Sequence, residues 1–453
     1  MVEDIFNPLR LSRDVLEAAI ETLSLVELDG LDLRAAMSRA VFQLQVKEAS
    51  RVREARRLTF EILNQKNLLD TILKRVLAPI ELDDLKLGVQ AFLRIFVFTT
   101  RISHSPIKPV YLADLGRQVL GWKELIPVEL ALGRIAAVNP EETRRKYFGD
   151  EGLALRTFNP LWFVKYVIRN FGRQEALEML SYSGLKGRTF VRANVLRNKE
   201  SKILKNLKSE GIVVEALRGF PNVYEVLDAK KGLRRCIVAG ELCLQDLPST
   251  LAAVASNSRP MKNVLFVGAS PTAEITYLAQ LMSNKGTITV LDSSEKRLSR
   301  VLADASAAQV SIVRTNLVED FETISNVFAD TVMLHAPSSR TGVFWREPSI
   351  KWRTQPGFVK YFKNVQEGLL DIWSEALDAG GNLVYWTTSI AIEEDELMIE
   401  RFMARHPEFV LAETFPKIGV PGLRGQSQSQ RLFPHLHLCD GVFVARLEKV
   451  KNT

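Results

Sequence analysis

The first third of the chain shows apolar side chains at three- and four-residue spacing, which is typical of amphipathic helices. The spacing is clearest in residues 33–49 and 51–78, and Pro79 fits the end of the second stretch. The same pattern continues in residues 85–98, 114–120 and 128–137. Residues 1–148 are therefore predicted to form an all-helical bundle.

A junction at residues 140–157 interrupts this pattern with charged residues and glycines. Beyond it, two apolar helical stretches meet near Gly172, residues 189–196 alternate as a strand does, and a short amphipathic helix precedes a second strand at 212–217. Mixed elements of this kind predict a small α/β domain over residues 155–255.

Residues 256–453 alternate short apolar runs with amphipathic helices. The apolar runs lie at 263–269, 287–292, 310–316, 330–336 and 381–388, and a last one at 441–448 is expected to be antiparallel. This order predicts a doubly wound, Rossmann-like sheet. The runs ending at His335 and Thr387 continue into small polar loops, which we expect to form two walls of one pocket at the carboxyl edge of the sheet.

Composition narrows the function only a little. The chain has 453 residues with a net charge of +7, which permits a polyanionic partner without requiring one. No apolar run is long enough for a membrane span, and the N-terminus lacks a signal-peptide pattern. Cys236, Cys243 and Cys439 have neither disulfide-framework nor zinc-site spacing, so a cytoplasmic location is expected.

The two polar loops carry a family resemblance. The sequence His335-Ala-Pro-Ser-Ser-Arg-Thr-Gly342 resembles the D-A-P-C-S-G-T-G motif of the RsmB/Sun/Nop RNA cytosine-C5 methyltransferases, and Tyr385-Trp-Thr-Thr-Ser389 resembles their Y-S-T-C-S motif. Trp162, Arg192-x-Asn194 and Gln245-Asp-x-x-Ser249 match further family positions. The resemblance implies a methyltransferase domain over 256–453, a small α/β RNA-binding domain over 155–255 and an NusB-like RNA-binding domain over 1–148.

The resemblance also places a cofactor site for S-adenosylmethionine. The family's turn C-A-A-P-G-G-K-T corresponds to Gly268, Ala269, Ser270, Pro271, Thr272, Ala273, Glu274 and Ile275, of which the first seven are the expected cofactor contacts. Glu274 replaces the family's lysine, so a carboxylate is expected near the cofactor's own carboxylate. Asp292 stands where the family binds the ribose hydroxyls, although it could also cap the following helix. Asn316 corresponds to a residue near the adenine amino group, and His335 replaces an aspartate that faces the pocket.

The family's chemistry depends on two cysteines that are absent from this chain. One thiolate adds to C6 of cytosine so that C5 can accept the methyl group, and the other assists release of the adduct. Thr388 stands at the attacking position and Ser338 at the release position. A hydroxyl needs an adjacent base before it can attack, and no such base is evident from the spacing.

Basic residues suggest where RNA would bind. Arg188, Arg192, Lys202 and Lys205 lie in the most basic stretch, which predicts an RNA-backbone track or, alternatively, a solvated helix face. A second basic stretch contains Lys47, Arg51, Arg53, Arg56 and Arg57. Arg340 either grips phosphate or blocks the cofactor.

His435 and His437 would share one face of a strand, but no third ligand is evident, so no metal site is predicted.

Together these features predict an RNA-binding homologue of the RsmB-type rRNA/tRNA methyltransferases without cysteine-dependent activity. Its expected partners are structured RNA, either rRNA or tRNA, and ribosome-assembly factors. An active methyltransferase with altered chemistry is the alternative, so whether the protein is an enzyme stays open. A third alternative is a subunit that uses the fold to bind a partner protein.

Overall fold

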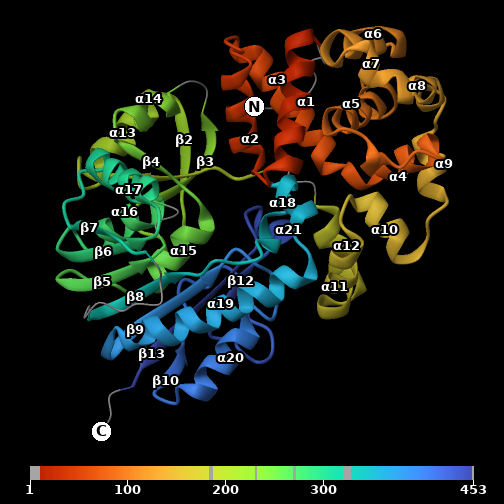
Figure 1. The fold of residues 1–453 in the computed structure, drawn as a ribbon. Coiled ribbons are helices and arrows are strands. Elements are labelled where there is room, and N and C mark those ends of the chain that lie inside the picture. Colours follow the sequence, from red (N-terminus) through yellow and green to blue (C-terminus); the bar gives the residue numbers. More distant parts are fainter. Residues whose placement is uncertain (1–10, 183–186, 230–231, 269–271, 320–327, 451–453) are drawn as a thin grey trace. The chain divides into compact units, whose positions relative to one another are not determined.

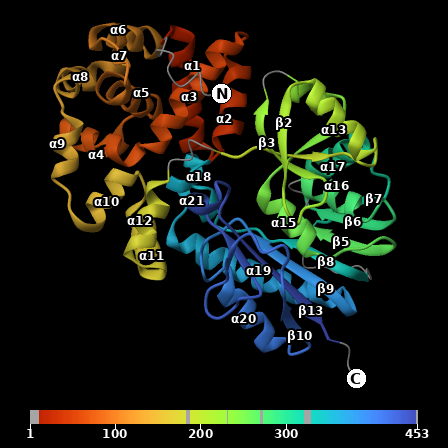
Figure 2. The same cartoon turned by 180° about the vertical axis from the view of Figure 1, so that it is seen from behind.

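The computed structural model describes residues 11–182, 187–229, 232–268, 272–319 and 328–450 (Figures 1 and 2). The chain forms two compact units. The helical unit contains residues up to Ser181 together with Phe344–Gln355, and the sheet unit contains Tyr182–Val343 and the residues from Pro356 onward.

The helical unit confirms the predicted all-helical N-terminal region. Helix α5 (Leu87–Val97) is its central element, because every side chain from Val89 to Val97 is buried. The single stretch expected at 51–78 is two helices, which meet at Gln65 where the backbone leaves helical geometry. The other helices are α1 (Arg13–Leu28), α2 (Leu33–Gln43), α3 (Ala49–Asn64), α4 (Lys66–Leu77), α6 (Pro109–Leu120), α7 (Trp122–Leu125), α8 (Glu129–Ala136), α9 (Pro140–Arg145), α10 (Gly149–Thr157), α11 (Leu161–Phe171), α12 (Arg173–Ser181) and α18 (Pro348–Arg353).

Helix α18 comes from the C-terminal half of the chain but completes the helical unit. The Lys351 ammonium donates hydrogen bonds to the backbone oxygen of Asn64 at 3.2 Å and to its Oδ1 at 3.0 Å. The Trp352 indole donates to the backbone oxygen of Leu63. Burial lowers the pKa of Lys351 to about 7. The division into domains 1–148, 155–255 and 256–453 stays a prediction. The two compact units are defined by contacts between residues, and their boundaries do not test the predicted ones.

In the sheet unit, a small antiparallel sheet has the strand order β2-β3-β1-β4. Its strands are β1 (Phe190–Ala193), β2 (Ile212–Ala216), β3 (Val223–Ala229) and β4 (Leu242–Gln245). Helices α13 (Glu200–Ser209) and α14 (Leu233–Val238) bury Ile203, Leu207 and Cys236 in a core shared with these strands. The α/β character expected for this stretch is therefore present.

The large sheet has the order β11-β12-β13-β9-β8-β5-β6-β7 and confirms the Rossmann-like prediction. Neighbouring strands from β9 to β7 are parallel, and β13 is antiparallel to β9 as expected. The strands are β5 (Lys262–Val267), β6 (Gly286–Asp292), β7 (Val313–Leu317), β8 (Ala329–His335), β9 (Leu377–Thr387), β10 (Phe409–Ala412), β11 (Val420–Pro421), β12 (Gln430–Leu432) and β13 (Val442–Lys449), with β10 paired to β13.

Helices cover both faces of the large sheet (Figure 1). One core contains residues of α15 (Leu247–Ala255), α16 (Thr272–Leu281) and α17 (Glu295–Ala307). The other contains residues of α19 (Pro356–Glu375) and α20 (Glu396–Arg405). The strand order reverses between β5 and β8, so their carboxyl ends mark the position where such sheets bind ligands. Among the described helices, none is both long and apolar enough to cross a membrane.

Candidate active site at the carboxyl edge of the large sheet

Gly268 lies close to the carboxyl end of β8. It follows β5 with a φ of +96°, and a Cβ atom at this position would lie 3.3 Å from the backbone oxygen of His335. Glycine alone adopts this backbone conformation readily, so the residue suits the predicted cofactor turn. The next three predicted cofactor contacts, Ala269, Ser270 and Pro271, lie outside the described residues.

Ser338 and Thr388, which the resemblance aligns with two family cysteines, lie side by side. Ser338 Oγ and Thr388 Oγ1 are 3.2 Å apart. The backbone holds their loops together, because the Ala336 N–H donates to the Trp386 oxygen and the Gly342 N–H donates to the Thr388 oxygen, both at 3.1 Å. The predicted meeting of the two loops is thus present.

Among the described residues, neither hydroxyl has a hydrogen-bonded base. Across the described part of the chain, Ser338 and Thr388 make their side-chain hydrogen bond to each other, not to a histidine or a carboxylate. An alcohol has a pKa far above neutral, so without a neighbouring base it stays protonated and is a weak nucleophile. The pair is therefore suited to hydrogen bonding rather than to covalent attack.

A close contact between Gly342 and Gly441 brings a third segment against these two loops. The Gly342 N–H donates to the Thr388 oxygen, and the Gly342 backbone oxygen accepts a hydrogen bond from the Gly441 N–H at 2.8 Å. A Cβ atom on Gly342 would lie only 1.9 Å from the Gly441 oxygen, so no larger residue fits. Cys439 stands two residues before Gly441, but burial raises the pKa of its thiol, which disfavours the thiolate that nucleophilic attack requires.

Glu394 holds the loop that contains Ser338 and Ser339 through a hydrogen bond to its backbone. Its Oε2 accepts hydrogen bonds from the Ser339 N–H at 2.9 Å and from the Gln366 amide at 3.0 Å. The same Gln366 amide donates to the Pro337 oxygen at 2.8 Å. Burial raises the pKa of Glu394 to about 7. Glu394 was not among the predicted site residues; its only signal in the sequence is the acidic run 393–396 shortly after the second loop.

The titration of Glu394 should make the stability of the protein depend on pH. Because its folded-state pKa of about 7 exceeds the ordinary 4.5, the folded protein binds the proton more tightly, and stability falls as pH rises between these values. The variant Glu394→Gln has no carboxyl group at this position and so loses this protonation equilibrium. The unfolding free energy of the variant relative to wild type should rise by about 3 kcal/mol across that window.

Urea unfolding near pH 5 and near pH 8 would measure this difference. Glu400→Gln is the control, because Glu400 forms a partly exposed ion pair with Arg424 on the same α20 region. If the unfolding free energy changed equally between the two pH values in wild type and Glu394→Gln, the raised pKa of Glu394 would be contradicted.

A fully buried ion network underlies the second loop. Arg431 donates from Nε to Glu396 Oε1 at 2.6 Å and from Nη1 to the Ile390 oxygen at 3.2 Å, and its Nη2 lies 3.0 Å from Asp395 Oδ2. Asp395 Oδ1 in turn accepts from the Thr387 hydroxyl at 2.7 Å. All three charged side chains are excluded from solvent. The network therefore connects the strand carrying Arg431 to both ends of the Thr387–Ile390 turn.

His335 takes a different role from the aspartate of the family motif. Its ring stacks on Trp386, with the ring centres 3.7 Å apart and the planes inclined by 6°. A flat aromatic stack replaces the fixed negative charge that the resemblance implies for this position. The wall of the pocket is correspondingly less anionic than the family motif predicts.

Asp292 is buried at the carboxyl end of β6, at the end of the strand expected from the sequence. Its Oδ1 accepts from the Ser294 N–H at 2.7 Å and from Arg297 Nε at 2.9 Å. The helix cap is Ser294 itself, so Asp292 is not the N-cap. A ribose would have to share this carboxylate with Arg297 or displace it. Asn316, near the end of β7, is exposed.

Glu274 lies inside the protein. Its side chain is fully excluded from solvent, and among the described residues neither carboxyl oxygen has a hydrogen-bond partner. Burial, and secondarily the charge of Asp246, raises the pKa of Glu274 well above its ordinary value. The repulsion of a cofactor carboxylate expected from the sequence requires an ionised Glu274, whereas burial favours the neutral acid. The neighbouring Thr272 hydroxyl donates to Asp304 at 2.5 Å, and Ala273 is half-buried.

The predicted RNA-binding residues divide into two groups. The Arg192 guanidinium is fully buried and donates to Gln280 and Thr276, so it is held inside the protein and does not face RNA. Arg188 is paired with Glu225 through Nε at 2.7 Å. Lys202 and Lys205 are exposed on α13, and Arg340 is exposed with a φ of +58°.

The histidine pair does not lie on a strand, contrary to expectation. His435 and His437 belong to the short helix α21 (Pro434–His437). His437 Nδ1 accepts from the Phe433 N–H at 2.9 Å, and burial lowers the pKa of His437. The helix-start proline at 434 determines this local geometry, which alternation of residues could not reveal.

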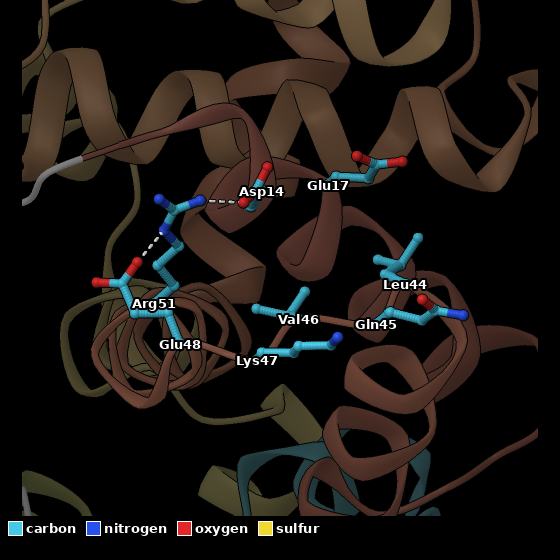
Figure 3. A pocket seen from close by; sticks show the side chains of 8 residues that line it. All are labelled: Asp14, Glu17, Leu44, Gln45, Val46, Lys47, Glu48 and Arg51. Atoms are coloured by element: carbon cyan, nitrogen blue, oxygen red, sulfur yellow. Dashed lines mark hydrogen bonds and ion pairs between the residues drawn. The ribbon is translucent and has the colours of Figure 1, made fainter.

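A hollow of about 330 Å³ lies in the helical unit beside the other predicted basic stretch (Figure 3). Its wall includes Asp14, Glu17, Lys47, Glu48 and Arg51. Figure 3 shows Arg51 reaching both Asp14 and Glu48, and its Nε lies 2.6 Å from Glu48. Two carboxylates thus already compensate the positive charge of Arg51, which makes this member of the second basic stretch less suited to binding phosphate.

Comparison with known proteins agrees with this geometry. The family model described as 16S rRNA methyltransferase RsmB/F matches residues 253–448. The chain is related to the RsmB/Sun/Nop-type RNA methyltransferases. The matched segment, here called the RsmB/F-type domain, contains the large sheet, both loops and the Asp292 position.

Two curated relatives and one solved structure illustrate the relationship. The Caenorhabditis elegans 26S rRNA (cytosine-C(5))-methyltransferase nsun-1 is 29% identical over 61% of this chain and 44% of its own length. The probable ribosomal RNA small subunit methyltransferase B of Bacillus subtilis is 26% identical over 66% of this chain and 68% of its own. The crystal structure of PH0851 shares the fold, with a TM-score of 0.80, 24% identity and coverage of 98% of this chain and 100% of that one.

Proposed function

We propose that this protein is an RNA-binding homologue of the RsmB-type rRNA/tRNA methyltransferases that does not perform cysteine-dependent methylation of cytosine C5. The 3.2 Å contact between Ser338 Oγ and Thr388 Oγ1 carries this proposal. The two hydroxyls occupy the positions of the attacking and releasing thiols, and neither has a base beside it within the described chain. Thiolates form near neutral pH, whereas unassisted hydroxyls do not ionise there.

Exposed lysines on and beside α13 support an RNA-binding role. Lys199, Lys202, Lys205 and Lys208 recur every third residue and are all exposed. A row of ammonium groups can follow a phosphate backbone, because each contact releases condensed counterions. The curated relatives named above are rRNA methyltransferases, which makes structured RNA the proposed partner. An rRNA or tRNA substrate, ribosome-assembly partners, an NusB-like role for the helical unit and a cytoplasmic location stay predictions.

Reversing two of these charges should weaken RNA binding at low salt. The double variant Lys202→Glu/Lys205→Glu is expected to reduce the slope of log affinity against log salt by about two, or about one for each lost phosphate contact. Fluorescence anisotropy with a labelled rRNA fragment over a salt series would measure the slope. The effect should be similar for different RNA sequences, because phosphate contacts do not read bases.

The matched control is a double variant that changes the net charge by the same amount at a different surface. Arg259 and Lys285 are exposed next to the amino ends of β5 and β6, at the edge of the sheet away from the pocket. Arg259→Glu/Lys285→Glu should leave most of the salt slope intact. Equal losses in both double variants would show a general charge effect rather than a binding surface on α13.

The described residues fit S-adenosylmethionine only in part. Gly268 and the buried Asp292 suit the cofactor turn and the ribose, whereas Arg297 already occupies the Asp292 carboxylate and Glu274 replaces the family's lysine. A bound cofactor would supply the electrophilic methyl group. Asp292 would orient its ribose, and Gly268 would allow close backbone approach.

The preserved Asp292 and Gly268 favour one second candidate, an active S-adenosylmethionine-dependent RNA methyltransferase with altered chemistry. Such an enzyme would methylate a nitrogen or oxygen that needs no attacking thiolate. Calorimetric titration with S-adenosylmethionine, alongside the Bacillus subtilis relative, separates the two candidates. Micromolar binding that is lost in Asp292→Ala would support the enzyme, and no heat at millimolar cofactor would support the RNA-binding homologue.

A further inference from the structure

The beginning of α19 presents large aromatic side chains to solvent. Phe358 and Tyr361 are 45% and 62% exposed, although they stand only three residues apart on the same helix face. The Phe362 ring neighbours both, with ring centres 5.2 Å from Tyr361 and 6.5 Å from Phe358. We call Phe358, Tyr361 and Phe362 the α19 aromatic face. Clustered exposed aromatics of this kind usually mark an interaction site.

The helix segment that carries the α19 aromatic face is basic in sequence. Residues 356–366 contain two lysines, Lys360 and Lys363, and no aspartate or glutamate. Lys360 is exposed, and Lys363 is 3.7 Å from Glu367 at the next turn. Aromatic rings with neighbouring ammonium groups match the two parts of an unpaired nucleotide, the base and the phosphate. A purely apolar protein partner would gain nothing from the lysines.

The same helix also supports the pocket loop. Leu369, Leu370 and Trp373 pack in the sheet core, and Gln366 donates to the Pro337 oxygen at 2.8 Å. Figure 1 shows α19 running along the sheet beside β9. Phe358 stands eight residues before Gln366, which corresponds to about 12 Å of helix. Phe358 is therefore offset along α19 by this distance from Gln366, which holds the Ser338 loop.

We propose that the α19 aromatic face, together with Lys360, is a stacking platform for unpaired RNA nucleotides that flank the nucleotide held at the pocket. This inference rests on the proposed RNA-binding function. Proteins that read RNA loops and bulges stack the exposed bases on aromatic rings, whereas they contact duplex RNA mainly through phosphates and riboses. The platform therefore selects RNA with an unpaired segment over a fully paired helix.

Two measurements test the platform with oligouridine, which does not self-pair, and a hairpin duplex of equal length. In the wild-type protein, ultraviolet crosslinking of oligouridine carrying 5-iodouridine should map to Phe358 or Tyr361. The Phe358→Ala/Tyr361→Ala variant should bind oligouridine about 10-fold or more weakly. It should bind the hairpin with little change and keep the salt slope. Tyr361→Trp should retain binding, because a larger ring still stacks.

The control is Leu302→Ala, which removes an exposed apolar side chain from α17 and should leave both affinities unchanged. If wild-type protein binds RNA, but the double alanine variant binds oligouridine equally well and the crosslinks map elsewhere, the platform is overturned while the proposed function survives. If the wild-type protein binds neither RNA, the proposed function fails and the platform fails with it.

Discussion

Purified protein supplied with S-adenosylmethionine and unmethylated rRNA is expected to form 5-methylcytosine at least about 10,000-fold more slowly than a cysteine-bearing relative. The reason is the chemistry of the contact between Ser338 and Thr388. Attack on cytosine C6 requires an anionic nucleophile, and a threonine hydroxyl without a base supplies almost none at neutral pH. Mass spectrometry of the digested nucleosides would measure the product directly and would also reveal methylation at other atoms.

The Bacillus subtilis relative serves as the positive control for this assay. The Thr388→Cys variant separates a missing nucleophile from an unsuitable pocket. Because Ser338 still lacks the releasing thiol, a pocket that accepts cytosine should yield an RNA–protein adduct that survives denaturing electrophoresis. Formation of 5-methylcytosine by the wild-type protein at a rate near that of the relative would refute the proposed function.

Replacing Arg431→Met should destabilise the sheet unit by about 3–5 kcal/mol. The methionine keeps much of the side-chain volume but leaves the carboxylates of Asp395 and Glu396 buried without their cation. It also removes the hydrogen bond to the Ile390 oxygen, which helps to shape the Thr388 loop. Urea unfolding followed by tryptophan fluorescence would measure the loss, since Trp373 and Trp386 are buried in this unit.

The pH dependence of this variant gives an independent check. Burial raises the pKa of Asp395, and the loss of Arg431 removes the positive charge that opposes this shift. A raised folded-state pKa means that stability is greatest at low pH and is lost as pH rises, so Arg431→Met should recover part of its stability in acid.

Arg424→Met is the matched control for Arg431→Met, because Arg424 and Glu400 form a half-exposed ion pair. Its loss should cost at most about 1 kcal/mol. Similar unfolding free energies for the two methionine variants would show that the buried network contributes little.

The sequence by itself determined the order and type of the main elements and the meeting of two loops. Apolar runs separated by amphipathic helices predicted the strands β5, β6, β8 and β9 close to their observed positions, because a central parallel strand is buried on both faces. The run at 310–316 only partly matches β7 (Val313–Leu317), which is a partly exposed strand at the end of the sheet. The carboxyl ends of parallel strands share one edge, so the sequence predicted that the loops of Ser338 and Thr388 would meet. This much depends on local periodicity and on a general rule of sheet topology.

Only the tertiary structure decided which charged residues are buried and which chain segments pack together. Arg192 looked like part of a basic surface, yet Gln280 and Thr276 hold its guanidinium inside the protein. The partners of Glu394 and Arg431, and the docking of α18 on α3, lie tens to hundreds of residues apart in the sequence. Local patterns record periodicity and charge, whereas burial and pairing depend on contacts between distant segments, which a single sequence does not display.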